Sequence, residues 1–246
     1  MRMNVVRWTV VFTLCLGIIS VSTHADNWQN GDLTTYNAPD WVTNQSAINL
    51  LFNNFYSVYA ADGGTMVLGD PTNFILVFSG PTTLSEYLPT SGAPGPLDSS
   101  LDDPLATSAG IFGGDVAALE LDVDFADAHL LPGNSSAVFG DLIMEGFDVP
   151  GVNGLTVRQF LAIGNSELGG GPGPFAIADS EFIMQQLDGS FTGGMATTYA
   201  EQHLVSSTAA PVVPTPEPSS LPLLAIALSS LGMVSYSWRE FRRINS

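Results

Sequence analysis

Apolar residues in the segment 47–59 recur at the spacing of an amphipathic helix. From Ile48 to Tyr59 they fall at i, i+3, i+4, i+7 and i+11, which places them on one helix face. Asn44 or Ser46 is suited to cap the start, because a short polar side chain accepts a hydrogen bond from the unpaired N–H groups of a first turn. The pattern therefore predicts a helix over residues 47–59.

Shorter segments carry patterns that are typical of strands. Residues 66–68 and 74–78 are apolar, and the turn-forming sequence 69–71 separates them. In residues 118–125 leucine, valine and phenylalanine alternate with acidic residues. This alternation predicts a half-buried strand with one apolar face. A further strand is expected over residues 137–143, after a Pro-Gly-Asn turn.

The segment 156–205 carries helical patterns. Thr156 and Gln159 have the spacing of a capping box, which predicts a helix from residue 157. A Gly/Pro run at 169–174 interrupts the chain, and further helices are expected over 179–187 and 195–205. Strands before helices predict an α+β fold, a single domain with antiparallel strands followed by C-terminal helices.

One long connection leaves the number of subdomains open. Residues 89–104 form a loop rich in Gly, Pro and Asp, and a loop of this length is uncommon inside a folded domain. It is either functional or a seam between two halves.

The N-terminus has the three parts of an export signal. Arg2 and Arg7 precede an apolar run at 10–19, and Thr23-His24-Ala25 offers small residues for cleavage before Asp26. The run is short for a membrane-spanning helix. We expect residues 1–25 to be a signal peptide that is handled by the general export machinery and a signal peptidase.

The C-terminus has the order of a membrane anchor. A linker at 206–215, rich in Pro, Ser and Thr, leads to an apolar run at 221–238 and a basic tail at 239–243. Eighteen helical residues span about 27 Å, close to the hydrocarbon thickness of a bilayer. Positively charged residues stay on the cytoplasmic side, so Arg239, Arg242 and Arg243 are expected to stop transfer.

These C-terminal features are similar to the PEP-CTERM sorting signal. Pro216, Glu217 and Pro218 precede the apolar run and the arginine cluster, so that the resemblance covers residues 213–243. It implies that residues 216–243 are a sorting signal read by an exosortase-type membrane transpeptidase. It also implies that the protein is anchored in the inner membrane before processing and is then released to the cell surface or an exopolysaccharide matrix. The ectodomain, residues 26–205, resembles no characterised family.

Charge and cysteine content narrow the function classes. The chain has no lysine, and residues 26–218 carry Arg158 as their only Lys or Arg against 23 of the 24 acids, a formal charge of −22. Such a surface repels phosphate backbones, so we expect no nucleic-acid partner. The only cysteine, Cys15, lies in the expected export signal, so no disulfide or thiolate site is expected after cleavage.

Four acidic residues are the candidate metal ligands. On a strand, side chains two residues apart lie about 6.6 Å apart, so Glu120, Asp122 and Asp124 would form an acidic row with Asp127 just beyond. Calcium prefers oxygen ligands and could bridge such a row. A solvated outer face is the other interpretation and the favoured one. No other cofactor is indicated.

No catalytic constellation is recognisable. Glycoside hydrolysis needs two carboxyls at a set separation in a cleft, which a sequence cannot show. His129 and His203 are the only histidines beyond the expected export signal, and there is no G-x-S-x-G motif. The glycine run at 169–173 has no lysine after it and is therefore not a phosphate loop.

Aromatic and basic residues have two interpretations. Trp28, Tyr36 and Trp41 either stack on sugar rings or pack into the core from an early strand, and packing is favoured. Arg158 is expected to form a buried or partly buried ion pair with a nearby acid, in a structural role.

Together these features predict a non-enzymatic surface or matrix protein that is structural or adhesive. Its acidic face would interact with calcium, cationic groups or polysaccharide. Two alternatives stay open: a secreted glycan hydrolase that uses Asp/Glu pairs, and a calcium-dependent carbohydrate-binding module.

Overall fold

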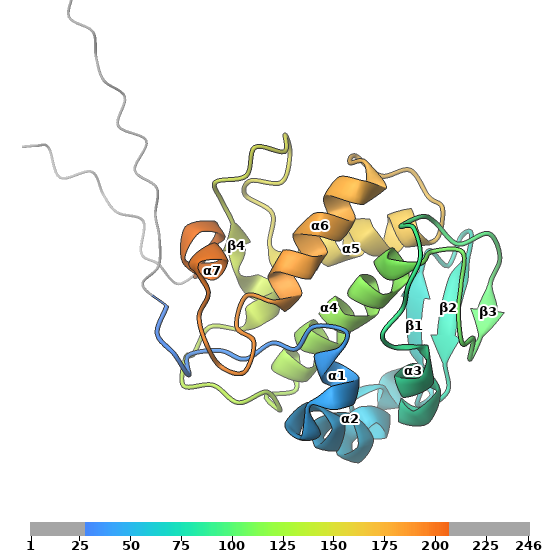
Figure 1. Ribbon diagram of the computed structural model, residues 1–246, viewed down its shortest axis with the longest axis horizontal. Helices are drawn as coiled ribbons and strands as arrows, with labels where there is room; N and C mark the ends of the chain where they lie inside the picture. The colour runs from blue at the N-terminus through green and yellow to red at the C-terminus, as the bar shows by residue number, and fades with distance from the viewer. Residues whose placement is uncertain (1–27, 207–246) are drawn as a thin grey trace, which may run out of the picture. The chain divides into compact units, whose positions relative to one another are not determined.

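The computed structural model describes residues 28–206, which form a mixed α+β fold (Figure 1). The elements follow in this order: α1 (Asp40–Thr43), α2 (Gln45–Val58), η1 (Ala60–Asp62), β1 (Met66–Gly69), β2 (Ile75–Phe78), α3 (Pro81–Tyr87), β3 (Leu101–Asp102), α4 (Ile111–Asp127), η2 (Phe139–Asp141), β4 (Ile143–Met144), α5 (Val157–Leu168), α6 (Ile177–Asp188), α7 (Thr198–His203) and β5 (Leu204–Val205). Here η marks a 3-10 turn.

The expected signal peptide and sorting signal lie outside the described residues, as does the expected linker apart from Ser206. Within residues 28–206 no helix is both long and apolar enough to cross a bilayer. The described residues belong to one unit of the fold, so the loop at 89–104 is not a seam between two halves.

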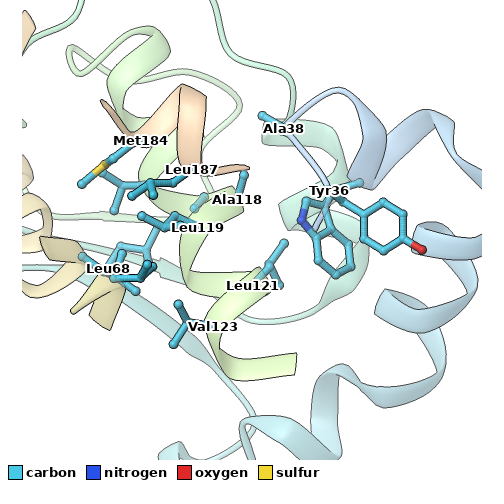
Figure 2. Packing of buried hydrophobic residues seen from close by; sticks show 14 of the residues in the cluster. Tyr36, Ala38, Leu68, Ala118, Leu119, Leu121, Val123, Met184 and Leu187 are labelled. Atoms are coloured by element: carbon cyan, nitrogen blue, oxygen red, sulfur yellow. The ribbon is translucent and has the colours of Figure 1, made fainter. Parts of the chain in front are cut away.

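Helix α4 passes through the middle of the fold and is buried on nearly all sides. It packs against α5, α6 and η2, and its neighbours surround it in Figure 1. Figure 2 shows Leu119 pointing toward Leu68 and Met184, whereas Leu121 points toward Tyr36. Both leucines are fully buried. Because apolar side chains leave the helix in opposite directions, α4 forms the centre of the hydrophobic core.

The two predicted early strands are confirmed and form most of a small sheet. β1 and β2 pair antiparallel, from Met66 opposite Phe78 to Gly69 opposite Ile75, and β3 adds in parallel to β2. Gly69 has a φ of +94°, a left-handed conformation that glycine adopts without strain, and it begins the tight connection to β2.

The predicted strand over residues 118–125 is wrong, because these residues lie within α4. Alternation indicates a strand only if one face is solvated. A helix that is buried on all sides also needs apolar residues in every direction and loses its 3.6-residue period. Ala and Leu, which occupy five of the 17 positions of α4, are good helix formers. A run of 17 residues also exceeds the usual length of a strand.

The predicted order of strands followed by helices is also wrong. α1 and α2 precede the first strand, and the longest helix stands between β3 and β4. The predicted strand over 137–143 is a short 3-10 turn, η2, followed by the two-residue strand β4. The predicted helix over 195–205 is shortened to α7, because Leu204 and Val205 pair with β4 as an antiparallel strand.

Three predicted helices are confirmed, two of them with their caps. Asn44 accepts a hydrogen bond from the Ser46 N–H at the start of α2. The capping box of α5 has both of its hydrogen bonds, from the Gln159 N–H to the Thr156 hydroxyl and from the Thr156 N–H to the Gln159 side chain. The helix expected over 179–187 is α6.

The N-terminal aromatic residues lie in the core rather than on the surface. Trp41, on α1, packs edge to face against Tyr36 and Phe125 with ring centroids 5.2 and 5.3 Å apart. The Trp28 indole N–H donates to the Leu204 carbonyl oxygen at 2.8 Å, so the first and last described segments are joined. Packing is confirmed, although no strand carries these residues.

Candidate functional site

The acidic residues of α4 project from two opposite faces of the helix. Successive side chains turn by about 100°, so Asp115 and Asp122, seven residues apart, share one face. Glu120, Asp124 and Asp127 are spaced by four and three and share the other. The predicted row of Glu120, Asp122, Asp124 and Asp127 is therefore corrected: Asp122 points away from the other three.

Asp122 and Asp188 form the most deeply buried acidic pair. Both are fully buried. The Asp122 carboxylate accepts the Tyr36 N–H, with distances of 3.0 and 3.1 Å to its two oxygens. Neither carboxylate oxygen of Asp188, the last residue of α6, has a hydrogen-bond partner. Burial raises the pKa of both groups well above the ordinary value for Asp. Burial without a nearby cation therefore favours the protonated form of both groups.

Asp115 extends this buried acidic face by two helical turns. Burial, and then the nearby Glu181 carboxyl on α6, raise the pKa of Asp115 to about 7. Its Oδ2 is buried without a hydrogen-bond partner. Asp115 and Asp122 on α4 thus face Glu181 and Asp188 on α6, with a spacing of seven residues on each helix.

The other acidic face of α4 turns toward α5 and the end of α2. The Asn165 side chain on α5 donates to Glu120 Oε2 at 2.8 Å. Burial, and then the nearby Asp124, raise the pKa of Glu120 to about 7, although Asn165 opposes the shift. Burial likewise raises the pKa of Asp124 to about 6, while the nearby Tyr59 hydroxyl opposes it. Glu120 and Asp124 therefore have pKa values close to neutrality.

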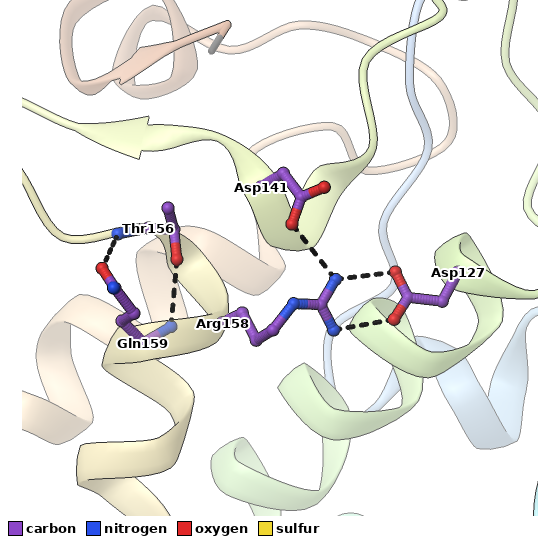
Figure 3. A network of polar contacts seen from close by, with 5 residues as sticks. All are labelled: Asp127, Asp141, Thr156, Arg158 and Gln159. Atoms are coloured by element: carbon purple, nitrogen blue, oxygen red, sulfur yellow. Dashed lines mark hydrogen bonds and ion pairs between the residues drawn. The ribbon is translucent and has the colours of Figure 1, made fainter.

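Arg158 forms the predicted ion pair at the end of this face (Figure 3). Its two terminal nitrogens donate to the two Asp127 carboxylate oxygens at 2.7 and 2.8 Å, and one also reaches Asp141 at 3.3 Å. These hydrogen bonds from Arg158 raise its pKa further above the ordinary value. The side chains of Arg158 and Asp127 are 42 % and 41 % exposed, so the pair lies at the surface and joins α4 to α5.

Two pockets of similar size lie on the described part of the chain. One, of about 200 Å³, lies between residues 32–34 and 126–139 and is lined by Asp32 and His129. The other, of about 230 Å³, lies beside the glycine-rich loop at 170–173 and is lined by Glu167. Each lining contains one carboxyl group, whereas glycoside cleavage uses two across a cleft.

The loop at 169–173 is packed closely against Glu167. A side chain at Gly173 would overlap the Glu167 carboxylate. Glu167 is only 3 % exposed, its Oε2 has no hydrogen-bond partner, and burial raises its pKa. The glycine run thus covers a buried carboxyl group.

Within residues 28–206, no three or more His, Cys, Asp or Glu side chains are placed so as to hold a metal ion. His129 is exposed just after α4, and His203 ends α7 with Nδ1 2.9 Å from the Glu145 carbonyl oxygen. His129 thus lies at the surface and His203 at a helix end. The strand geometry that suggested a calcium site does not form.

No protein-family model, curated protein or solved structure matches this chain significantly.

Sequence reasoning did not single out Asp115, Glu167 or Asp188. The seven-residue spacing of Asp115 and Asp122, together with that of Glu181 and Asp188, is the pattern that could have revealed the buried pairs. It becomes informative only once 118–125 is taken as a helix.

Proposed function

We propose that this chain is an exported, non-enzymatic protein of a bacterial cell surface or exopolysaccharide matrix, delivered through its C-terminal sorting signal. Residues 1–25 are removed on export. Residues 221–238 hold the protein in the inner membrane until an exosortase-type transpeptidase acts near Pro216, Glu217 and Pro218. The observation that carries the proposal is the order of tripeptide, apolar run and arginine cluster at the C-terminus.

The residues at the two ends of the described domain belong to its core. The last strand, β5, ends at Val205, one residue before the Pro/Ser/Thr-rich segment that we interpret as a linker. At the other end Trp28 is buried and bonded to Leu204, two residues after the proposed cleavage before Asp26. The residues proposed for processing thus flank a domain with its own core.

The negative charge of the domain supports contact with cationic partners at the cell surface. Arg158 is the only Lys or Arg of residues 28–206, and it is bound to Asp127 and Asp141. The exposed carboxyl groups elsewhere carry unbalanced negative charge, which attracts cationic partners and divalent ions. Contact with calcium, cationic groups or polysaccharide would follow from this charge rather than from a catalytic cleft.

The sorting signal is tested by replacing Pro216, Glu217 and Pro218 with alanine in the full-length chain, expressed in its own host. Cell fractions are then examined by immunoblotting and the mature ends by mass spectrometry. The wild-type protein is expected outside the inner membrane without residues 221–246. The triple variant is expected to accumulate at the inner membrane with this segment retained.

A matched control replaces Pro211 and Pro214, which lie in the same proline-rich stretch, with alanine. This control keeps the tripeptide and should be processed like the wild type. Equal processing of the wild type and the triple variant would overturn the proposed signal. Equal loss in both variants would assign the effect to linker stiffness instead.

A further inference from the structure

The contact between α4 and α6 contains carboxyl groups without a compensating cation. Asp122 and Asp188 are fully buried there, and Asp115 is 9 % exposed. The only Lys or Arg of residues 28–206, Arg158, pairs with Asp127 and Asp141, next to the opposite face of α4. A buried carboxylate needs a countercharge or several hydrogen bonds to remain ionised. The alternative is to keep its proton.

The groups that face these carboxyls from the surrounding elements are acidic or neutral. The negative charge of Asp40 on α1 raises the pKa of Asp122, whereas the Tyr36 N–H donates a hydrogen bond to the Asp122 carboxyl and opposes this shift. Glu181 on α6 and the phenol of Tyr87 on α3 lie near Asp115. The Thr35 hydroxyl donates to the backbone carbonyl of Asp188 at 2.6 Å and leaves its carboxyl unpaired. None of these groups would stabilise a negative charge at Asp188.

Glycine-rich segments connect α6 to the rest of the fold at both of its ends. A Gly/Pro-rich segment at 169–174 precedes it, and a turn containing Gly189, Gly193 and Gly194 follows it. In Figure 1 α6 lies on the outside of α4 and α5. Peripheral elements of this kind open at a lower free energy than the core to which they dock.

We propose that the α4–α6 contact is a pH-sensitive latch, closed while its buried carboxyl groups are protonated and released as the pH rises above neutrality. Release frees α6 from α4 while α2 and the β1–β2 sheet stay folded. It exposes the apolar face of α6, formed by Ile183, Met184 and Leu187, which is buried in the closed state. The protein thereby gains an apolar surface in alkaline medium.

The direction of the pH effect follows from proton linkage. Docking raises the pKa of Asp115, Asp122 and Asp188 above the value of a solvated carboxyl. The latch is therefore fully closed below the undocked pKa of about 4. Docking weakens as the pH rises toward and through the docked value. In that window each buried carboxyl changes the docking equilibrium roughly tenfold per pH unit.

Hydrogen exchange of the full-length chain in detergent micelles tests the latch. Amide protection is measured by mass spectrometry at about pH 6 and about pH 8.5, with the intrinsic exchange rate corrected for pH. We expect the opening equilibrium of α6 to increase at least roughly tenfold, with α2 and β1–β2 little changed. Unchanged protection of α6, or equal loss in α6 and α2, would overturn the proposal.

Two variants and a control identify the groups responsible. Asp188→Asn and Asp122→Asn each remove one titrating group while preserving its shape, so each should lower the pH dependence of α6 opening by about tenfold per pH unit. Asp148→Asn removes an exposed carboxyl from the loop before α5 and should behave as the wild type. Wild-type pH dependence in both buried-site variants would show that these carboxyls are not the switch.

Discussion

Substituting Gly169 with alanine probes the closest packing between α5 and the β1–β2 turn. Gly169 follows the last residue of α5 and has a φ of −70°, a conformation that alanine adopts without strain. An added Cβ would lie 2.6 Å from Asp70 Cβ and 2.7 Å from the Phe74 carbonyl oxygen, and closer still to the Asp70 nitrogen. Two of these atoms belong to the backbone, so no side-chain rotation relieves the overlap.

The expected cost follows from what must move. The Asp70 N–H donates to the Phe74 carbonyl at 2.9 Å, and the Asn73 side chain donates to the Gly169 carbonyl at 2.7 Å. Opening this turn strains both hydrogen bonds, and overpacking of a well-packed site costs about 1–3 kcal/mol. In a domain of this size each kcal/mol lowers the melting temperature by about 2–4 °C. We therefore expect Gly169→Ala to melt about 2–12 °C lower.

Gly189 provides the matched control. It follows the last residue of α6 with a φ of −78°, and an added Cβ would come no nearer than 3.3 Å, to the Gln185 carbonyl oxygen. Gly189→Ala should change stability by less than about 0.5 kcal/mol, because the alanine also restricts the unfolded chain. Thermal unfolding of the full-length chain followed by circular dichroism measures both variants. Equal melting temperatures for the two would refute the proposed packing at Gly169.

Three further substitutions test the core, a helix cap and the ion pair. Leu121→Ala removes a fully buried side chain and should lower the free energy of chemical unfolding by about 2–5 kcal/mol. Leu105→Ala, at an exposed site, should lower it by less than about 0.5 kcal/mol. Similar losses in the two variants would contradict the placement of α4. Thr156→Ala removes the cap of α5 and should lower the free energy of unfolding by about 1 kcal/mol, while Thr156→Ser retains the hydroxyl and most of the stability. Arg158→Lys loses the two-pronged contact with Asp127, but at a half-exposed site the loss should be no more than about 1 kcal/mol. The loss of stability caused by Arg158→Lys should also be smaller in about 1 M salt. A larger loss that does not depend on salt would contradict a surface role for the ion pair.

Helices with a solvated face could be predicted from the sequence, because their signals are local. α2 shows its apolar stripe and its Asn44 cap, and α5 shows its capping box, within a few residues of each start. The antiparallel β1–β2 pair was equally accessible, because Gly69 begins a short turn between two apolar runs. In each case the pattern depends on contacts between residues that are close in sequence.

Helix α4 could not be predicted in this way, because its environment is set by distant segments. α5 and α6 lie on different sides of it, and Trp41 covers Phe125. Burial all round removes the polar face that marks an amphipathic helix. Leu119, Leu121, Val123 and Phe125 then imitate a strand when they are read along the chain.

Composition constrains the site more firmly than local pattern does. A domain (residues 26–205) with one arginine, no lysine and 22 acids has almost no cation to place beside an acid in its core. Burial there therefore raises the pKa of a carboxyl group above its ordinary value. α4 shows both of its acidic faces in this condition, toward α6 through Asp122 and toward α5 through Glu120. Surface repulsion among the exposed acids also grows as the pH rises. Both effects stabilise the domain in mildly acidic medium. If the buried carboxyl groups dominate, α6 opens locally as the pH rises. If surface repulsion dominates, the whole fold loosens.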